Sequence, residues 1–353
     1  MPHTTSPIDA IITWVDGDDP AHKAKLHAYF KTLGRDIPGS AAPTRFRERG
    51  ELEYCVASIL RFAPWVRTIH IVTDNQTPPF LEGDTGRALA DKINLVDHTT
   101  VFRGYEDVLP VFSCRPIETV LWRIPELADR FIYFNDDMML TRPVDPTDFF
   151  QDDQLVLRGH WTRHTHQQWL FRLKRSRPIR ALRPTPLRPN RANHLRMQEL
   201  SARAMGFNGR YFNIPHEPHP AFKHQMEALF EAHPDWLRDN IRHKLRHPDQ
   251  IWSFSLATHQ AIQDDRAMFA RHPKLALLKA ENYTVPGIRW ALHRLSRSRR
   301  TAFLCVQSLD QATPAVQDHV IQWLEAHVGG LPTEVDSKNE YREYLGDKFD
   351  QPN

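Results

Sequence analysis

Cysteine is scarce in this chain of 353 residues, which has only three. Cys55, Cys114 and Cys305 are far apart, and no two of them form a CxxC pair. A disulfide framework or a structural zinc site would need more cysteines at closer spacing, so neither is expected. Cys55 and Cys305 lie in apolar runs, where we expect them to be small core residues.

A long hydrophobic run is also missing. No stretch of about 18 apolar residues occurs, so the sequence predicts no transmembrane helix. Residues 1–10 lack the basic start and the apolar stretch of a signal peptide. With 41% hydrophobic and 25% charged residues, the composition is typical of a globular protein with a substantial core. We therefore expect a cytoplasmic protein.

Acidic residues are absent between Asp153 and Glu199, although the net charge of the whole chain is only +3. This part of the chain is rich in Arg and Pro, and we interpret residues 151–210 as a basic insertion or lid in a single catalytic domain that spans residues 1–353. The basic residues of its central part are Arg172, Lys174, Arg175, Arg177, Arg180, Arg183, Arg188 and Arg191. A second basic run comprises Arg289, Arg294, Arg297, Arg299 and Arg300.

Basic runs of this kind attract anions such as nucleotide diphosphates, anionic polysaccharides and lipid head groups. The alternative is a solvated loop that binds nothing. The runs are compatible with peripheral contact at the inner face of the membrane, where lipid-linked acceptors would be found. They are not interleaved with aromatic residues as in nucleic-acid-binding modules, so no nucleic-acid partner is expected.

Short apolar, β-branched runs alternate with amphipathic stretches along the chain. The strand-like runs lie at residues 8–15, 68–73, 93–96 and 131–134. The stretches with helical spacing lie at residues 21–33, 51–61, 115–124, 223–245, 249–263 and 314–328. This alternation predicts an α/β fold with a mainly parallel sheet flanked by helices. Ligands of such sheets bind outside the carboxyl ends of the strands, so the polar residues there are the first candidates for function.

Asn135, Asp136 and Asp137 directly follow the strand-like run at residues 131–134. Two adjacent carboxylates suit Mg²⁺, which prefers oxygen ligands and is usually held by one or two carboxylates together with substrate phosphates. Asn and Asp also form ordinary turns after a strand, so turn formation is the alternative.

The first strand-like run ends in a similar way, at Trp14 and Asp16. The indole ring could stack on a nucleobase, and the carboxylate could accept a hydrogen bond from a ribose. Because Asp18, Asp19 and Pro20 follow at once, an ordinary turn is the alternative here as well.

Two further places carry groups that can accept a proton. Glu118 lies near the edge of the buried face of the helical stretch at 115–124 and could bind an acceptor or act as a base, although such a glutamate is more often solvated. His216 and His219 form an HxxH pair in a Pro-rich segment, and histidine accepts a proton near neutral pH. The HxxH spacing also suits a metal, but no third zinc ligand lies at a typical spacing.

Arg242, Lys244 and Arg246 form a cationic patch near the end of the helical stretch at 223–245. A guanidinium group suits phosphate because it donates two parallel hydrogen bonds. The alternative is a solvated cluster of charges on the face of a helix.

Taken together and in order, these motifs resemble the conserved blocks of the Stealth proteins. The first block is similar to residues 8–20, Ile-Asp-Ala-Ile-Ile-Thr-Trp-Val-Asp-Gly-Asp-Asp-Pro. The second is similar to residues 45–76, from Arg-Phe-Arg-Glu-Arg-Gly to Ile-Val-Thr-Asp-Asn-Gln, and it continues through residues 109–110, 117–118 and 131–137. The third is similar to Pro-His-Glu-Pro-His at 215–219 and His-Lys-Leu-Arg-His-Pro-Asp at 243–249.

The Stealth family includes bacterial capsule sugar-phosphate transferases and the animal enzyme that places GlcNAc-1-phosphate on lysosomal glycoproteins. The resemblance implies a nucleotide-sugar-transferase-like fold, a nucleotide-sugar donor, a requirement for Mg²⁺ or Mn²⁺ and a phosphodiester product. By position it implies catalytic roles for Glu118, Asp136, Asp137, His216 and Arg246. Asp136 and Asp137 would also hold the metal, and the donor would be bound by Trp14, Asp16, Arg45 and Asp74.

The expected reaction moves hexose- or N-acetylhexosamine-1-phosphate from a nucleoside diphosphate sugar, with a UDP-sugar favoured, to a hydroxyl of a glycan or lipid-linked saccharide during capsule or exopolysaccharide synthesis. One alternative is a metal-dependent glycosyltransferase that releases a nucleoside diphosphate. The other is a non-catalytic protein that binds a glycan or a nucleotide. The chain departs from the family in the C-terminal block, where residues 305–310 lack the family's Asn-Asp pair and Asp310 is the candidate to replace it.

Overall fold

The main sheet is built from four parallel strands and one antiparallel strand. A computed structural model describes residues 6–34, 36, 50–165 and 194–331. The sheet has the order β10-β4-β1-β2-β3, and β10 alone runs antiparallel, at the β4 edge. The mainly parallel α/β sheet expected from the sequence is confirmed. The strands are β1 (Ile8–Thr13), β2 (Ile69–Thr73), β3 (Ile93–Asp97), β4 (Arg130–Asn135) and β10 (His219–Phe222).

Smaller sheets extend this framework. One has the order β12-β13-β5, in which β13 from the C-terminal part of the chain pairs antiparallel with β5, the strand that follows β4. Its strands are β12 (Lys274–Lys279), β13 (Thr301–Gln307) and β5 (Met138–Leu140). The others combine β11 (Ala267–Phe269), β7 (Gln154–Leu157) and β6 (Phe150–Gln151), and β8 (His160–Arg163) with β9 (Arg210–Asn213).

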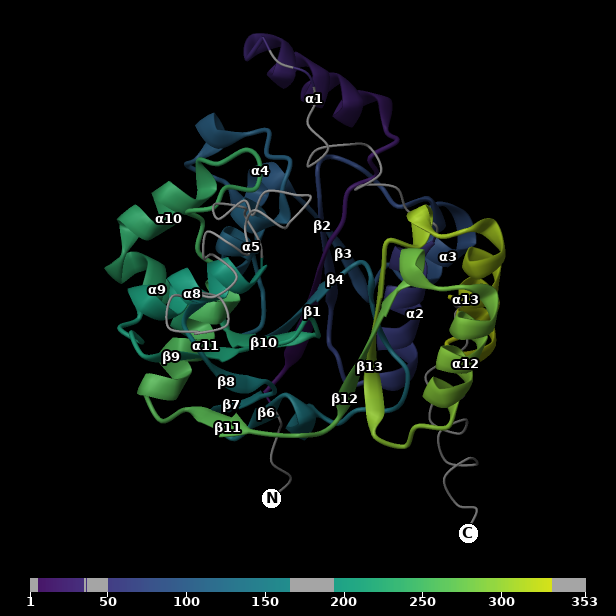
Figure 1. The fold of residues 1–353 in the computed structure, drawn as a ribbon. Coiled ribbons are helices and arrows are strands. Elements are labelled where there is room, and N and C mark those ends of the chain that lie inside the picture. The colour runs from purple at the N-terminus through teal and green to yellow at the C-terminus, as the bar shows by residue number, and fades with distance from the viewer. Residues whose placement is uncertain (1–5, 35, 37–49, 166–193, 332–353) are drawn as a thin grey trace, which may run out of the picture.

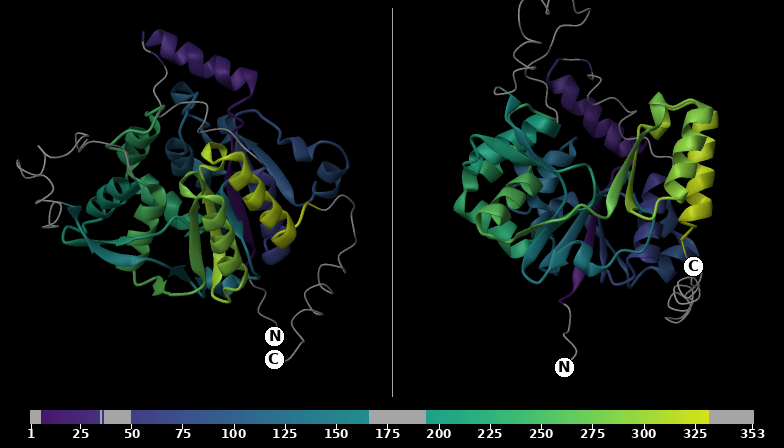
Figure 2. Two further views of the ribbon diagram at one scale, coloured as in Figure 1. Left: turned by 45° about the vertical axis from the view of Figure 1, so that its right-hand side comes forward. Right: turned by 60° about the horizontal axis from the view of Figure 1, so that its bottom comes forward.

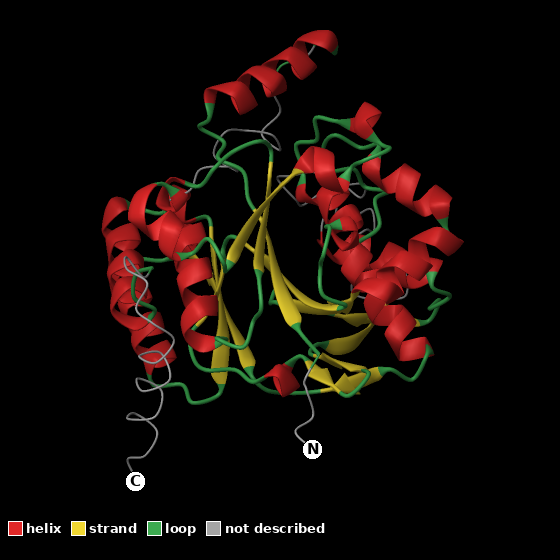
Figure 3. Cartoon of the chain, turned by 180° about the vertical axis from the view of Figure 1, so that it is seen from behind, coloured by secondary structure: helices red, strands yellow, loops and turns green. Residues whose placement is uncertain are grey.

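Helices stand on both sides of the strands (Figures 1 and 3). One group contains α2 (Glu51–Phe62), α3 (Gly83–Ala88), α12 (Val285–Ser296) and α13 (Pro314–His327). The other contains α4 (His98–Val101), α5 (Cys114–Val120), α8 (His194–Ala204), α9 (Lys223–Ala232), α10 (Pro234–Ile241) and α11 (Ser253–Gln263). The first helix, α1 (Pro20–Thr32), extends beyond the end at which β1 leaves the sheet (Figures 1 and 2).

Local sequence signals account for several helix ends. Asp19 caps α1, because its carboxylate accepts a hydrogen bond from the backbone N–H of His22 at 2.6 Å. The stretch expected as one helix at residues 223–245 is two helices instead, and α10 begins at Pro234. Proline has no N–H to continue a helix and disfavours helical backbone in the residue before it, so this prediction was wrong in its continuity.

One hydrophobic core joins the layers. Leu52, Val56 and Ile59 of α2 are fully buried in it, which confirms the helical spacing seen in the sequence. Leu155 of β7 and Met197 of α8 also belong to this core. The single domain with a basic insertion at 151–210 stays a prediction. Residues 166–193, with the eight basic residues named above, lie outside the described residues.

A buried carboxylate ties the strands of the main sheet to each other at their amino ends. Asp9 of β1 is fully buried, and it accepts hydrogen bonds from Arg67 at 2.6 and 2.9 Å and from the backbone N–H of Ala128 at 2.7 Å. His70 lies 3.2 Å away. Burial alone would raise the pKa of Asp9, but the hydrogen bonds from His70, Arg67 and Ala128 outweigh it and lower the pKa to about 2.

We expect Asp9→Asn to lower the free energy of unfolding by about 2–3 kcal/mol at pH 7, because several charge-assisted hydrogen bonds are weakened. The folded-state pKa of about 2 lies below the ordinary value of 3.8. These bonds therefore stabilise the fold fully at a pH above 3.8 and less as the pH falls from 3.8 toward 2. Urea unfolding at pH 7 and pH 3 should therefore show a smaller difference between variant and wild type at pH 3. Asp91→Asn, at an exposed position, serves as the control and should unfold like the wild type.

Candidate active site

Strand topology brings distant parts of the chain together at the carboxyl end of β4. In the parallel pair β1–β4, Thr13 is the register partner of Asn135. In the antiparallel pair β10–β4, His219 is the register partner of Tyr133. Because β10 runs against β4, the segment that enters β10, which contains His216, lies beside the end of β4.

The expected acidic pair forms the turn between β4 and β5. Asp136 and Asp137 are both partly exposed. Asp137 is held from the neighbouring strand β13: its carbonyl accepts a hydrogen bond from Val306 N–H at 3.0 Å, and its Oδ2 accepts one from the Cys305 thiol at 3.3 Å. Its Oδ1 lies 3.6 Å from Nε2 of His216. Asp137 and His216 therefore face each other, with side chains 24% and 21% exposed.

A row of buried polar groups leads from α5 to His216. Glu118 is 2% exposed, and its Oε2 accepts a hydrogen bond from Arg115 at 2.9 Å. The Tyr133 hydroxyl lies 3.0 Å from the other oxygen of Glu118 and 2.6 Å from the amide oxygen of Asn135. The Asn135 amide nitrogen lies 3.1 Å from Nε2 of His216. The solvated environment that we considered for Glu118 is thus wrong, because Arg115 and Tyr133 hold this carboxylate inside the protein.

Positive charge gathers on the same side. Arg115 is buried, with its guanidinium carbon 5.3 Å from the centre of the Trp252 ring. Arg246 is exposed, and its Nη2 lies 4.0 Å from Sγ of Cys114, the first residue of α5. The ring of His194 lies 6.0 Å from that of His216, and burial, together with the neighbouring Arg115 and His216, lowers the pKa of His194 to about 3. His194 is therefore uncharged at neutral pH, while the exposed Arg246 can meet an anionic ligand.

The other two cations of the expected patch have structural partners. The Lys244 ammonium donates hydrogen bonds to the backbone carbonyls of residues 108–110 at 2.8–3.2 Å. Arg242 forms an exposed ion pair with Asp239 at 3.4 Å. Arg246 is therefore the member of the patch that lies against α5 and the site.

The residues present fit a divalent metal through their carboxylates. Among the described residues, Asp137, His216 and Cys305 place one ligand atom each within 4.8 Å of one another. Burial and the neighbouring Asp137 raise the pKa of the Cys305 thiol well above its ordinary value, so the thiol stays protonated and donates to the carboxylate. Oδ1 of Asp137 is buried and accepts no hydrogen bond. An unsatisfied carboxylate oxygen next to a second aspartate, Asp136, suits a cation that prefers oxygen ligands.

The residues expected to bind the donor lie at neighbouring strand ends. Trp14 is only 3% exposed and packs in the core, so the expected stacking of its ring on a nucleobase is corrected to a core role. Asp16 forms the turn that was its alternative, with Oδ1 accepting a hydrogen bond from Asp18 N–H at 2.7 Å. Its backbone is tied to Gln76 by hydrogen bonds of 2.9 and 3.0 Å. Arg45 lies outside the described residues.

Asp74, at the end of β2, is already engaged by α1. Its carboxylate lies 3.3 Å from Nδ1 of His22 and 2.8 Å from Nζ of Lys25. Burial would raise the pKa of Asp74, but the hydrogen bonds from His22 and Lys25 hold it well below the ordinary value. The carboxylate therefore fastens α1 to the sheet, and a role in donor binding stays a prediction.

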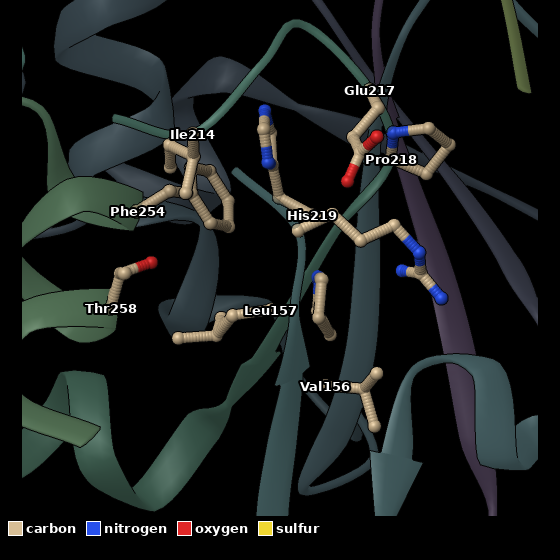
Figure 4. A pocket seen from close by; sticks show the side chains of 10 residues that line it. Val156, Leu157, Ile214, Glu217, Pro218, His219, Phe254 and Thr258 are labelled. Atoms are coloured by element: carbon tan, nitrogen blue, oxygen red, sulfur yellow. The ribbon is translucent and has the colours of Figure 1, made fainter. Parts of the chain in front are cut away.

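The second histidine of the HxxH pair belongs to a separate place. His219 lines a small cavity of about 10 Å³ together with Glu217, Arg158 and Thr258 (Figure 4). Burial raises the pKa of Glu217 to about 7 and lowers that of His219 well below its ordinary value. The cavity has room for about one water molecule. His216 and His219 therefore do not converge on one metal in the described structure.

Three residues of the site, Tyr133, Arg115 and Cys305, were not predicted from the sequence to belong to it. Tyr133 carried a usable signal: a hydroxyl in a buried strand needs a partner, and Tyr133 points to the same face as Asn135 two residues later. Arg115 lies three residues before Glu118, which is the spacing of a helical ion pair. Cys305 carried none, because it meets Asp137 across 168 residues of sequence. The C-terminal block thus reaches the site through Cys305.

Comparison with known sequences finds two conserved regions of the Stealth proteins in this chain. Conserved region 1 of the Stealth proteins matches residues 6–33, and conserved region 2 matches residues 45–157. The chain is 43% identical over 148 residues to a capsular polysaccharide phosphotransferase of Streptococcus pneumoniae, an alignment that covers 42% of each chain. It is 29% identical over 280 residues to a receptor polysaccharide phosphotransferase of Streptococcus gordonii, covering 70% of this chain and 76% of the relative.

A third relative is an exopolysaccharide phosphotransferase of Streptomyces coelicolor, 43% identical over 145 residues, which cover 41% of this chain and 25% of the relative. The aligned part of the chain thus spans about two fifths of the length of the Streptococcus pneumoniae relative and a quarter of the length of the Streptomyces coelicolor relative.

Among solved structures, mouse xyloside xylosyltransferase 1 is similar at a TM-score of 0.37 and 13% identity, over 85% of this chain and 98% of that chain. The WbbM bifunctional glycosyltransferase is similar at a TM-score of 0.45 and 10% identity, over 95% of this chain and 52% of that chain. Both likenesses are distant, so the fold assignment rests on the chain's own strand order. The ordered sequence matches, by contrast, begin with β1 and end with β7, and they include the acidic turn. The chain thus carries two conserved regions of the Stealth proteins and is similar to polysaccharide phosphotransferases.

Proposed function

We propose that the chain transfers a sugar-1-phosphate, either hexose- or N-acetylhexosamine-1-phosphate, from a nucleoside diphosphate sugar to a glycan hydroxyl. The product would be a phosphodiester of a capsule or exopolysaccharide, and a UDP-sugar is the favoured donor. The matches to Stealth conserved regions 1 and 2 and the names of the similar phosphotransferases support this choice of reaction.

The observation that carries the proposal is the meeting of the acidic turn with His216 at the end of β4. Asp136 and Asp137 supply negative charge for a metal, and Oδ1 of Asp137 lies 3.6 Å from Nε2 of His216. Arg246 lies against Cys114, the first residue of α5, which also carries Arg115 and Glu118. Phosphoryl transfer depends mostly on positioning and on neutralising charge, so a metal, a guanidinium and a base are a sufficient set.

The chain's own groups divide the work as follows. Mg²⁺ or Mn²⁺ held by Asp136 and Asp137 would neutralise the donor diphosphate. The acceptor oxygen forms a bond to the phosphorus that bears the sugar, and the bond from that phosphorus to the oxygen of the other nucleotide phosphate breaks. The nucleoside monophosphate leaves with the electron pair of that bond. His216 takes the acceptor proton, and Arg246 donates hydrogen bonds to the phosphoryl oxygens. Both carboxylate oxygens of Glu118 are already engaged, so Glu118 is the weaker candidate for the base.

The released nucleotide tests the reaction type. We expect incubation with Mg²⁺, a panel of UDP- and GDP-sugars and a capsule-type acceptor to release a nucleoside monophosphate, resolved by chromatography. EDTA and Asp137→Asn should abolish the release, since both remove the charge neutralisation. Asp84→Asn, whose side chain is 75% exposed on α3, is the matched control and should release nucleotide normally.

Other products would contradict the proposal. Release of a nucleoside diphosphate would show glycosyl transfer at the same donor site. No release with any donor and acceptor would favour a binding protein without turnover.

Arg246 offers a second test of the same chemistry. We expect Arg246→Ala to lower kcat/KM by about 100-fold, because one charged donor to the phosphoryl oxygens is lost. Arg242→Ala is the matched control, since Arg242 is exposed on the same segment and pairs with Asp239. Steady-state kinetics of both variants measure the effect. An equal fall in kcat/KM in the two variants would contradict the role of Arg246 at the phosphoryl oxygens.

We also propose that the second basic run contacts an anionic lipid surface. Trp290 on α12 is 61% exposed, and the guanidinium carbon of Arg294 lies 4.7 Å from the centre of its ring. No acidic residue occurs from 282 to 309. Tryptophan favours the membrane interface, and each nearby Lys or Arg adds about 1 kcal/mol on anionic lipid. Among the described residues, no helix is long and apolar enough to cross a membrane.

Vesicle sedimentation measures this contact. We expect the protein to sediment with phosphatidylserine-containing vesicles, and the double variant Trp290→Ser with Arg294→Ser to stay largely in the supernatant. Leu33→Ser, at an exposed apolar position directly after α1, is the control and should bind like the wild type. Equal sedimentation with purely zwitterionic vesicles would refute the role of charge.

A further inference from the structure

We infer that Glu118 acts through Tyr133 and Asn135 as a positioning residue, by fixing which nitrogen of His216 carries its proton. The row of contacts from Glu118 to His216 is described above, and its proton content can be counted. The effect of this tautomer of His216 on catalysis rests on the proposed function. The tautomer itself rests on geometry alone.

The count begins at Tyr133, whose hydroxyl has one proton. That hydroxyl lies 3.0 Å from a Glu118 oxygen and 2.6 Å from the side-chain amide of Asn135. It also lies 2.9 Å from Oγ1 of Thr13, which brings a proton of its own. A single phenolic proton cannot serve both a carboxylate oxygen and a carbonyl oxygen, so one of these two neighbours must itself be a donor.

Glu118 is not that donor. Arg115 lies 2.9 Å from its other oxygen, and both side chains are less than a tenth exposed, so the pair is held as a buried ion pair with an ionised carboxylate. The Tyr133 proton therefore points to Glu118. The group that Asn135 turns toward Tyr133 must then be its NH₂, which a half-turn of the amide supplies without moving the backbone.

This orientation decides the state of His216. When the NH₂ group faces Tyr133, the carbonyl oxygen of Asn135 takes the position 3.1 Å from Nε2 of His216. A carbonyl oxygen only accepts, so Nε2 must carry the proton. Oδ1 of Asp137 lies 3.6 Å from the same nitrogen and is an acceptor too. In the opposite tautomer, the lone pair of Nε2 would face a carboxylate oxygen, which is repulsive.

Every group in the row is then satisfied in one direction. His216 donates to Asn135, Asn135 to Tyr133, and Tyr133 to Glu118, which Arg115 neutralises. The hydrogen bond on one ring nitrogen of a histidine sets the reactivity of the other. Nδ1 of His216 is thus the basic atom, and the proton of the acceptor hydroxyl goes to Nδ1.

Nitrogen-15 NMR of the histidine-labelled protein tests the tautomer without any substrate. The His216 signals are identified by their loss in His216→Gln. At a pH where the ring is neutral, we expect the Nε2–H form in the wild type and a mixture of tautomers in Tyr133→Phe. A wild-type ring protonated on Nδ1 overturns the inference, whatever reaction the protein catalyses.

A double-mutant cycle tests the route from Glu118. Tyr133→Phe keeps the ring, which stacks on Phe254 at 4.7 Å, and removes only the hydroxyl. We expect it to lower kcat by about 10-fold or more with the donor KM unchanged, since orientation of the base is lost. Glu118→Gln should lower kcat in the wild type but have little further effect in Tyr133→Phe.

If the fold-losses in kcat of Tyr133→Phe and Glu118→Gln multiplied in the double variant, Glu118 would act on the substrate by itself. That result would refute the inference. Tyr211→Phe is the matched control, because Tyr211 is also buried but lies on β9 and contacts His164; its kcat should stay at the wild-type value. If the wild type turns over no donor, the proposed function fails, and the NMR result still decides the tautomer.

Discussion

The antiparallel pairing of β10 with β4 is the constraint on which the site depends. β1 to β4 are parallel, and on their own they would place acidic and amide side chains at one edge of the sheet without a histidine beside them. Because β10 enters the sheet in the opposite direction, the residues that precede it meet the residues that follow β4. His216 and Asp137 face each other for this reason, although 79 positions separate them in the sequence.

Burial of polar groups gives this edge its rigidity. Glu118, Tyr133 and Arg115 are nearly inaccessible to water, and each has a partner that compensates for the loss of hydration. A buried network of this kind has few alternative arrangements, because any rotation leaves a donor or acceptor unpaired. The groups that would meet the substrates, by contrast, are half-buried or exposed. The site therefore combines a buried, rigid polar network with side chains that solvent can reach.

The sequence predicted the elements well where the pattern was local. The alternation of apolar runs and helical stretches predicted β1 to β4 and α2, and the acidic pair Asp136–Asp137 was found because it directly follows a strand. Trp14 was misjudged, because a strand-end position does not reveal whether a ring points outward or into the core. The contact of Cys305 with Asp137 could not be predicted either, since it depends on the pairing of β13 with β5 rather than on any local pattern.

That last pairing has a consequence for how the protein is made. The chain emerges from the ribosome at roughly 5–20 residues per second. Cys305 follows Asp137 by 168 positions, so it is added on the order of ten seconds or more later. During this interval the acidic turn has no β13 to hold it, and β5 has an unpaired edge. The acidic turn is thus one of the last features to become fixed, after most of the parallel sheet has already been synthesised.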